Sequence, residues 1–512
     1  MATTKEQLIQ EDMKRLHAMG YAQELYRAMG GFSNFAISFT IISILSGCLT
    51  VFAFGFNSAG PLAASVGWPL VSLFTLFVAL AMAELASAFP TAGGLYYWSS
   101  KLGGPGWGWY TGWINLIGQV AVTAGIDFGL ATFVNILMNQ WWGTAQTPGV
   151  ILTTYAIALI LHAVMNILGV RVVALLNDVS VWWHIVVVAF IVVALAVKAP
   201  AHSFSTAFHT GFTNSGFSYW YGFLLGLLLS QYTITGFDAS AHMSEETIGA
   251  DRRAPWGIVM SVVVSAIAGY LLLMALVIAI PSVPGADKLS AVAGAPNGNP
   301  VGFIMNSALG QNLGTFLLAL AVVAQFYCGM SSITSNSRMI YAFSRDGAIP
   351  FSNVWHTLSK STRTPANAIV LGAVLSFLLA VPYYWNYTAY AAVTSIAVIG
   401  LFLSYIIPVY LRWRQGTTFV RGVWHLGSWS SFVDIVAMGW VAFITILFML
   451  PQVKPINRDN FNYTPIVVLG TLVALTIWYM LSVRHWFTGP KIQGTATELA
   501  RIEKDMGELS LV

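Results

Sequence analysis

The sequence predicts an all-α polytopic membrane protein with about twelve transmembrane helices. Of its 512 residues, 57% are hydrophobic and 8% are charged, whereas about 25% of residues in soluble domains are charged. The mean hydropathy is +0.72. A soluble protein of this length cannot cover its surface with so few charges, which excludes that class. The basic residues are scattered between apolar runs, so the net charge of +4 indicates no nucleic-acid partner.

Twelve apolar runs are long enough to cross a bilayer, which takes about 20 residues per helix. They occupy residues 33–58, 68–89, 107–137, 150–168, 177–197, 218–245, 255–281, 312–344, 366–383, 387–411, 431–450 and 464–485. We therefore expect an N-terminal tail (1–29), a ten-helix core (30–411), two further helices (412–485) and a C-terminal tail (486–512). The N-terminal tail has no apolar segment with a cleavage site, so it should be retained.

The basic residues predict the orientation. If the N-terminal tail is cytoplasmic, nineteen of the 23 Lys and Arg residues fall on that side. The other side carries Lys198, Lys288, Lys454 and Arg458. This asymmetry follows the positive-inside rule and places both termini in the cytoplasm. Cys48 and Cys328 lie within apolar segments, which predicts no disulfide and no metal site.

Two of the predicted helices contain a glycine near the middle, where the helix is expected to be interrupted. The first contains "ILSGCLT" (Ile44–Thr50) around Gly47, and the sixth contains "ITGFD" (Ile234–Asp238) around Gly236. Paired interruptions in corresponding helices of two inverted repeats point to a transporter's binding site at the midplane. The N–H and C=O groups freed at such breaks can bind a zwitterion without charged side chains.

Polar residues follow the second interruption in the stretch "ITGFDASAHMSEET". Asp238, His242, Glu245 and Glu246 are spaced to share one helix face. Asp238 is expected to cap the inner half-helix, with contact to a substrate amine as the alternative. His242 and the two glutamates are expected to line an inner gate, where Glu245 and Glu246 would pair with arginines such as Arg252 or Arg253.

Motifs of other functional classes are missing from the sequence. It contains no HExxH, no GxSxG and no GxxxxGK[ST], which argues against a membrane-embedded protease or hydrolase and against an ATP-driven pump. A channel would need a repeated filter loop, which twelve non-repeating helices do not supply. We therefore expect a transporter that is not an enzyme and has no cofactor. No oligomeric state is predicted.

The third helix carries Asp127, an acid within an apolar segment. Intramembrane acids are functional hypotheses by default, so substrate-amine contact or gating is one interpretation and interhelical packing is the other. Asn115 and Gln119 are expected to share its face approximately. Gln325, on the eighth helix, is expected to face the cavity.

Three long stretches resemble the amino acid–polyamine–organocation superfamily, and within it the amino acid/choline transporter family that includes GABA permeases. They are "AELASAFPTAGGLYYWSSKLGG" (Ala83–Gly104), "GFDASAHMSEET" followed by "RRAPWGI" (Arg252–Ile258), and "CGMSSITSNSRMIYAFSRDGAIP" (Cys328–Pro350). The resemblance implies a leucine-transporter-like fold, with two five-helix inverted repeats and two added helices. It also implies a substrate site at the two interruptions, formed by Ser43, Ser46, Gly47, Cys48, Gln119, Thr235, Gly236, Phe237, Asp238 and Gln325.

The same resemblance suggests how transport is coupled. "GVRVVALLNDVSVWWHI" (Gly169–Ile185) is similar to the fifth helix of proton-coupled relatives, and His184 falls where they have a lysine. Histidine changes charge near neutral pH, so His184 is expected to carry a proton, with a neutral structural histidine as the alternative. Ser331 and Ser332 match the hydroxyl pair of sodium-coupled relatives, which keeps sodium open as the coupling ion.

The expected function is import of a GABA-like or other small amino acid across the plasma membrane. A choline, polyamine or other amine transporter, or an exchanger of the same fold, is the alternative. The partners are therefore a small-molecule substrate and the lipid bilayer.

Overall fold

The computed structural model describes residues 4–386 and 389–505, and its regular elements are helices, with one isolated bridge between Met29 and Thr247. This confirms the all-α polytopic class. The first two residues of the predicted span 387–411, together with residues 1–3 and 506–512 of the predicted tails, lie outside the described part of the chain.

Eleven helices in the described residues are long and apolar enough to cross a membrane. They correspond to every predicted span except the sixth. The helices of the bundle are α2 (Gly31–Ile42), α3 (Ile44–Thr50), α4 (Phe52–Ala59), α5 (Trp68–Ala88), α6 (Gly94–Gly103), α7 (Pro105–Trp142), α8 (Pro148–Ile167), α9 (Val170–Lys198), α14 (Ala250–Ile278), α16 (Pro300–Leu309), α17 (Gln311–Arg345), α19 (Ala366–Ala380), α20 (Ala389–Gln415), α21 (Ser430–Met449) and α22 (Thr464–Leu481).

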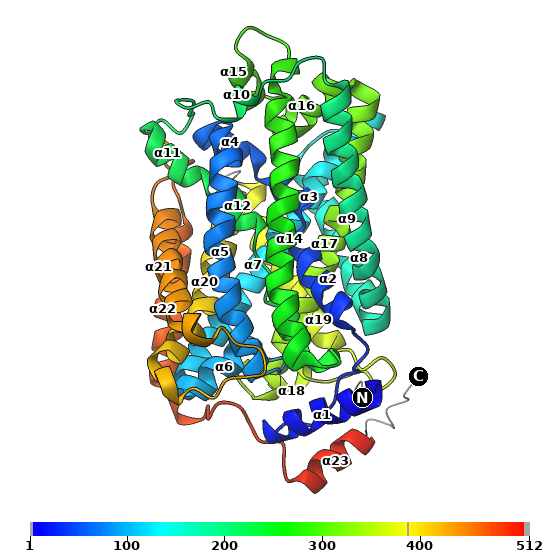
Figure 1. The fold of residues 1–512 in the computed structure, drawn as a ribbon, viewed down its shortest axis with the longest axis vertical. Helices are drawn as coiled ribbons and strands as arrows, with labels where there is room; N and C mark the ends of the chain where they lie inside the picture. Colours follow the sequence, from blue (N-terminus) through cyan, green and yellow to red (C-terminus); the bar gives the residue numbers. More distant parts are fainter. Residues whose placement is uncertain (1–3, 387–388, 506–512) are drawn as a thin grey trace.

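The sixth predicted span is not one helix. It consists of α11 (Tyr219–Gly226), α12 (Leu228–Thr233), the one-turn helix α13 (Ala239–His242) and a 3₁₀ turn (Ser244–Glu246). None of these pieces is long enough to span a bilayer alone. The segment therefore crosses the bundle as a broken helix, and α12 lies beside α3 in the middle of the molecule (Figure 1).

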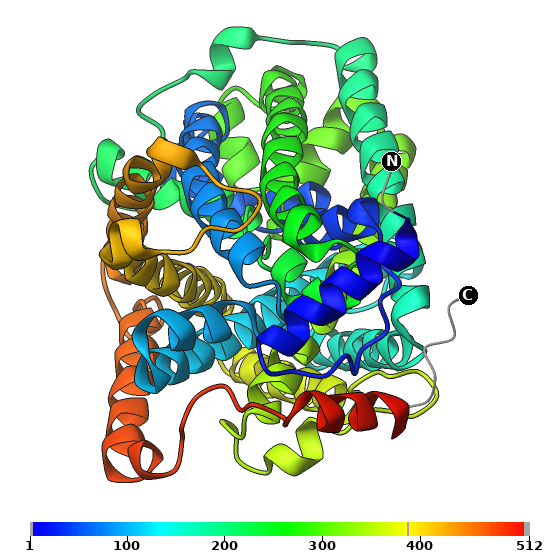
Figure 2. The same ribbon diagram turned by 60° about the horizontal axis from the view of Figure 1, so that its bottom comes forward.

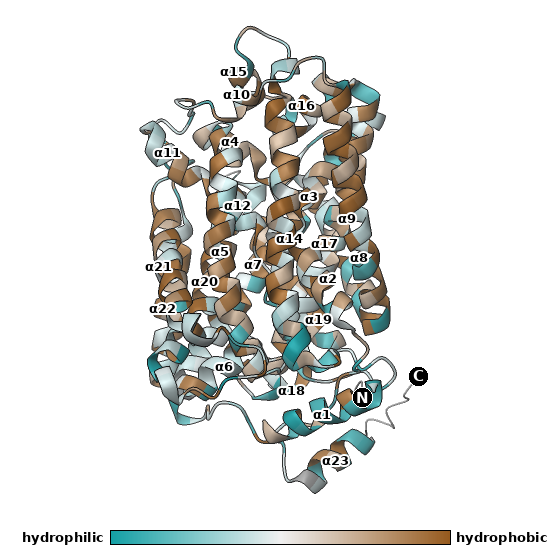
Figure 3. Ribbon diagram, viewed as in Figure 1, coloured by the Kyte–Doolittle hydropathy of each residue, from teal (hydrophilic) through white to brown (hydrophobic). Residues whose placement is uncertain are grey.

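The described parts of the N-terminal and C-terminal tails lie at the same end of the bundle, below called the terminal end (Figure 1). Two helices outside the bundle, α1 (Lys5–Ala18) and α23 (Ala496–Asp505), lie across that end (Figure 2). Hydrophilic residues gather there, while the middle of the bundle is mostly hydrophobic (Figure 3). The opposite end carries the short helices α10 (Phe204–Ala207) and α15 (Lys288–Ala293).

Glycine lets two long helices approach closely at the centre of the bundle. A Cβ added to Gly118 of α7 would lie 2.7 Å from the backbone N of Leu401, and one added to Gly400 of α20 would lie 2.9 Å from Cα of Gly118. Real Cβ atoms do not tolerate such contacts. The contact between α7 and α20 therefore requires both glycines. It also brings Gln119 of α7 and Tyr405 of α20 to the carboxylate of Asp238.

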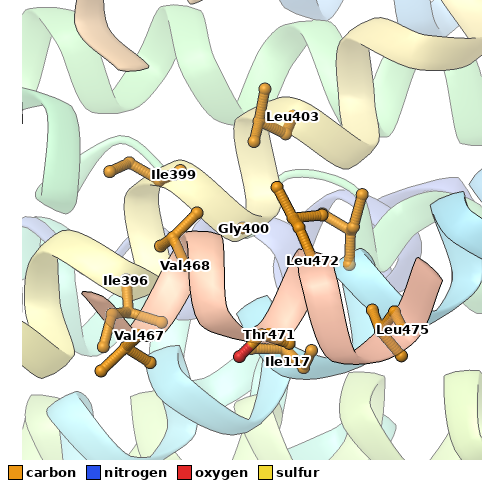
Figure 4. A pocket seen from close by; sticks show the side chains of 11 residues that line it. Ile117, Ile396, Ile399, Gly400, Leu403, Val467, Val468, Thr471, Leu472 and Leu475 are labelled. Atoms are coloured by element: carbon orange, nitrogen blue, oxygen red, sulfur yellow. The ribbon is translucent and has the colours of Figure 1, made fainter. Parts of the chain in front are cut away.

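An apolar pocket lies beside this contact, between α7, α20 and α22 (Figure 4). Its lining residues are Ile114, Ile117, Ile396, Ile399, Gly400, Leu403, Val467, Val468, Thr471, Leu472 and Leu475. Thr471 is the only polar side chain among them. A zwitterion needs hydrogen-bonding partners when it leaves water, so this pocket does not suit an amino acid.

Candidate functional site

The first helix is interrupted at Ser43, not at Gly47 as predicted. Ser43 separates α2 from α3 and has φ 34° and ψ 82°, in the left-handed region. The stretch Ile44–Thr50, which the sequence marked as the weak point, is itself the helix α3. A serine in this conformation is strained by about 1–3 kcal/mol and persists only where its surroundings hold it there.

His184 of α9 holds the first break. Its Nε2 lies 2.7 Å from Ser43 Oγ, and its Nδ1 lies 2.8 Å from the carbonyl oxygen of Ser180. A carbonyl only accepts, so in the neutral imidazole Nδ1 donates to Ser180 and Nε2 accepts from the Ser43 hydroxyl. Ser43 Oγ also accepts a hydrogen bond from the backbone N–H of Ser46 at 3.2 Å. Buried His184 is thus bonded directly to the break.

Gly47 permits a close contact between the two broken helices. An added Cβ would lie 2.7 Å from the side chain of Thr233 in α12. Ser46 and Cys48, which flank it in α3, are both buried. The glycine therefore marks where the two broken helices touch, and this explains why its signal in the sequence lies one helical turn beyond the actual break.

The second break spans Ile234–Asp238, as predicted. Gly236 has φ +86°, a conformation that favours glycine, and an added Cβ would lie 2.2 Å from Ile41 Cγ2. The Thr235 hydroxyl donates to the carbonyl oxygen of Tyr232 at 2.6 Å. The Phe237 ring is buried against Tyr405, with 5.0 Å between ring centroids.

Side chains of α2 satisfy backbone groups that the second break frees. The Ser38 hydroxyl donates to the carbonyl oxygen of Phe237 at 3.0 Å and accepts from the backbone N–H of Ser240 at 2.9 Å. Asn34 Nδ2 donates to the carbonyl oxygen of Ser240 at 3.0 Å. Non-helical backbone at membrane depth must be satisfied within the protein, so the second break depends on α2 of the first broken helix.

Asp238 is the centre of a buried polar cluster and does not cap α13, which corrects the predicted N-cap. It occupies the N-cap position without a side-chain cap bond. Its Oδ1 accepts from the Tyr405 hydroxyl at 2.7 Å, and its Oδ2 accepts from Gln119 Nε2 at 2.8 Å and, more weakly, from Asn115 Nδ2 at 3.4 Å. Side chains of two helices, α7 and α20, therefore converge on the carboxylate of Asp238.

His242 completes this cluster. Its Nδ1 lies 3.0 Å from the carbonyl oxygen of Ala92, so Nδ1 is the donor, and its Nε2 lies 3.3 Å from Asp238 Oδ2. Without a further proton, Nε2 and Oδ2 are two acceptors in contact. One proton on either atom turns this contact into a hydrogen bond. The pair is thus a buried position for one exchangeable proton.

Asp127 has a partner that the sequence analysis missed. His162 of α8 places Nδ1 3.0 Å from Asp127 Oδ1, with both side chains fully buried. Gly329 of α17 makes room for the pair, because a Cβ there would lie 1.9 Å from Asp127 Oδ1. Asp127 does not share the face of Asn115 and Gln119, which turn toward Asp238. The predicted common face is wrong because eight residues separate Asp127 from Gln119, and a helix turns about 80° beyond two full turns over that interval.

The two serines of α17 point to different helices. Ser331 donates to Asn177 Oδ1 of α9 at 2.6 Å, while Ser332 Oγ lies 2.7 Å from Thr123 Oγ1 of α7. Gln325, on the same helix, donates to Thr50 Oγ1 at 3.1 Å and to the carbonyl oxygen of Ile126 at 3.2 Å. These three side chains link α17 to its neighbours, and none of these bonds reaches Asp238 or His184.

The two glutamates form ion pairs with arginines of α17, not with Arg252 or Arg253. Glu245 accepts two hydrogen bonds from Arg345, both at 3.0 Å. Glu246 accepts from Arg338 Nε at 2.7 Å and from Nη2 at 3.3 Å. The stretch after α13 turns through a 3₁₀ segment, so the predicted single helix face does not exist. We call these two ion pairs the inner latch.

The backbone of one residue, Ala92, joins the inner latch to the cluster at the break. The N–H of Ala92, in the loop between α5 and α6, donates to Glu245 Oε1 at 3.0 Å, and its carbonyl oxygen accepts from His242. Asp238, His242, Ala92, Glu245 and Arg345 therefore form one connected chain. Two hydrogen bonds, both through the backbone of Ala92, separate His242 from the latch.

The N-terminal tail covers the inner latch. Arg27 donates to the carbonyl oxygens of Ser244 and Thr247 at 3.0 and 2.6 Å. Asp12 of α1 accepts from the N–H of Gly249 at 2.6 Å, at the start of α14. Burial raises the pKa of Asp12, against the opposing effect of Arg27. The latch is thus enclosed by protein on the side of the termini.

A bundle with two facing broken helices and a buried polar cluster at the second break defines a transporter-type site. The comparisons with known proteins agree. A family model described as amino acid permease matches residues 29–472. The chain is 41% identical to amino-acid permease BAT1 of Arabidopsis thaliana, over 93% of this chain and 95% of the relative, and 40% identical to its homolog in rice, Oryza sativa, over the same shares. A putative polyamine transporter of Candida albicans is 26% identical over 98% of this chain and 93% of the relative.

The chain therefore belongs to the amino acid permease family, within the amino acid–polyamine–organocation superfamily. The predicted superfamily is confirmed. The individual roles predicted for the site residues stay predictions.

We expect Gly236→Ala and Gly47→Ala to abolish amino acid uptake into proteoliposomes while the protein still inserts into membranes. Either methyl group would collide with the facing broken helix, and at Gly236 the conformation itself costs about 1–2 kcal/mol for a non-glycine residue. Gly439→Ala in α21 is the matched control, because nothing lies within 4 Å of its added Cβ. Uptake at the unmodified rate by either variant would contradict the two-break site.

The native cysteines allow a test of the inner latch. In a Cys328→Ser background, Cys48 is the single thiol and is fully buried. Replacing Glu245 and Glu246 by Gln should raise its labelling rate by a membrane-impermeant thiol reagent from the terminal end about tenfold or more, because a charge-assisted bond contributes about 1.5–3 kcal/mol. The control is Glu11→Gln on the exposed face of α1. An unchanged labelling rate with weaker substrate affinity would show that the glutamates take part in substrate binding and not in gating.

Proposed function

We propose that this permease is a secondary active transporter that imports a small amino acid, GABA-like in our first choice, by alternating access. The observation that carries the proposal is the pair of breaks at Ser43 and Ile234–Asp238, where side chains of α2 satisfy the backbone of the second break and Asp238 supplies a buried carboxylate. Such a site offers partners to both charged ends of an amino acid and excludes water.

The two ends of the substrate have different proposed partners. A helix leaves its first-turn N–H groups without intrahelical partners, so the backbone of Ile44 and Leu45 would face the substrate carboxylate. Asp238 is the acid at the breaks, and it would receive the amine by exchanging one of its present partners, Gln119 or Tyr405. Substrate contact by Gly236 and Phe237 follows from their place in the second break.

An amine substrate is the second candidate. Asp238 favours any ammonium group, and one relative is named a putative polyamine transporter. Choline or a polyamine would use the carboxylate and leave the N–H groups at Ile44 without a partner. An amino acid uses both, and this favours the amino acid as substrate.

The proposed coupling ion is the proton, carried by His184. Protonation at Nε2 would turn the Ser43 hydroxyl from donor to acceptor and change the hydrogen bonds at the first break. The alternative sodium site would need the hydroxyls of Ser331 and Ser332 together, and their separate partners, Asn177 and Thr123, favour the proton. The terminal end is proposed to face the cytoplasm of a plasma membrane, in line with the distribution of Lys and Arg.

The test is uptake of radiolabelled GABA into sodium-free proteoliposomes under an inward pH gradient. Uptake should exceed that without the gradient, and unlabelled GABA and neutral amino acids should compete. His184→Ala should lose the response to the gradient and keep some exchange. His162→Ala, on another buried histidine, is the control for a general loss of folding.

Three results would contradict parts of the proposal. Competition by choline or putrescine alone would assign an amine substrate. Strict dependence on sodium without any effect of the pH gradient would assign coupling to the serines. A full pH response in His184→Ala would mean that another buried pair carries the proton. Asp238–His242 is the candidate pair at the second break.

A further inference from the structure

A groove of about 440 Å³ lies between α2 and α14 at the terminal end of the bundle. Its lining residues are Gly31, Phe32, Phe35, Arg252, Arg253, Trp256, Gly257, Met260 and Val264. From Arg252 to Val264 the groove follows α14 for about 18 Å, at a rise of about 1.5 Å per residue. It therefore runs from the polar end of the bundle toward its apolar middle.

Two arginines form the polar end of this groove. Among the side chains that the structure describes, no acidic partner lies within 4.0 Å of Arg252 or Arg253, whereas the inner-latch arginines are each paired. Their acidic neighbour Asp251 is buried and forms an ion pair with Arg15 of α1. Arg252 is exposed and Arg253 half-buried. The groove thus offers two positive charges to a ligand.

Aromatic and apolar side chains form the rest of the groove. Phe32 is 46% exposed and Trp256 54% exposed, although both are large apolar residues. Trp182 of α9 stacks on Phe32 with 6.5 Å between ring centroids, and Trp424 meets Trp256 edge to face at 6.3 Å. Tryptophans in such a cluster are typical of the boundary between headgroups and acyl chains. A ligand here has one anionic end and one apolar end.

We propose that this groove binds an anionic phospholipid of the leaflet that faces the terminal end. Arg252 and Arg253 bind the headgroup phosphate by charge-assisted hydrogen bonds, and an acyl chain lies along Phe35, Met260 and Val264. Anionic lipids concentrate in the cytoplasmic leaflet, and basic pockets between transmembrane helices bind their headgroups. Which leaflet supplies the lipid depends on the orientation given in the proposed function, whereas the binding itself does not.

The lipid would bridge the inner half of the first broken helix to α14. Gly31 begins α2, and a Cβ there would lie 3.3 Å from Arg253 Cδ, so the arginine already lies against the start of that helix. Any movement of α2 away from α14 would widen the groove and separate the headgroup from the acyl-chain wall. The bound lipid therefore favours the state in which α2 stays packed against α14.

Native mass spectrometry of the purified full-length protein tests this proposal. Phosphatidylglycerol should bind more tightly than phosphatidylcholine with the same acyl chains. Arg252→Gln with Arg253→Gln should weaken phosphatidylglycerol binding about 30-fold, since each basic residue contributes about 1 kcal/mol. The same variant should weaken phosphatidylcholine binding less, because the choline charge offsets that of its phosphate. The matched control is Arg171→Gln with Arg414→Gln, two exposed arginines outside the groove.

Each other outcome overturns the proposal. Equal binding of the two lipids, or equal loss in the groove variant and the control variant, would show that these arginines do not form a lipid site. Displacement of phosphatidylglycerol by an equal concentration of glycerol 3-phosphate would show a phosphate site without an acyl-chain wall. Because binding is measured without transport, these results do not depend on whether the protein imports an amino acid.

Discussion

Non-helical backbone in the membrane must find hydrogen-bond partners within the protein, and this constraint organises the centre of the molecule. Asn34 and Ser38 of the first broken helix bond the backbone of the second. His184 holds the strained serine of the first break from a third helix. The glycine contact of α7 with α20 brings Gln119 and Tyr405 to Asp238. The polar centre therefore exists because two helices are broken side by side.

The same network connects the break to the terminal end. The backbone C=O of Ala92 bonds His242 and its backbone N–H bonds Glu245, which in turn binds Arg345. The N-terminal tail encloses these ion pairs through Arg27 and Asp12. Removing one partner of a buried ion pair leaves an uncompensated charge, which costs more than the pair contributes. Under the proposed alternating access, opening at this end would require the latch, the tail and the break to change together.

The sequence predicted the helices well because apolar length alone determines a membrane span, and it located the second break because Gly236 has a backbone conformation that favours glycine. It misplaced the first break because Gly47 reports a close helix contact, while the break itself uses a serine that only a distant histidine stabilises. The partners of Glu245, Glu246 and Asp127 lie about 35 to 100 residues away in the chain. Such pairings depend on helix packing, which local spacing does not encode. His162 could have been found in the sequence, because it lies within a predicted membrane span, as His184 does.

The central claim is that an amino acid binds between the two breaks, and a cryo-electron microscopy structure with saturating GABA tests it most directly. The account predicts density for the carboxylate at the backbone N–H groups of Ile44 and Leu45, and density for the amine within hydrogen-bonding distance of Asp238. Density in the apolar pocket between α7, α20 and α22, or at any position that contacts neither break, would contradict it.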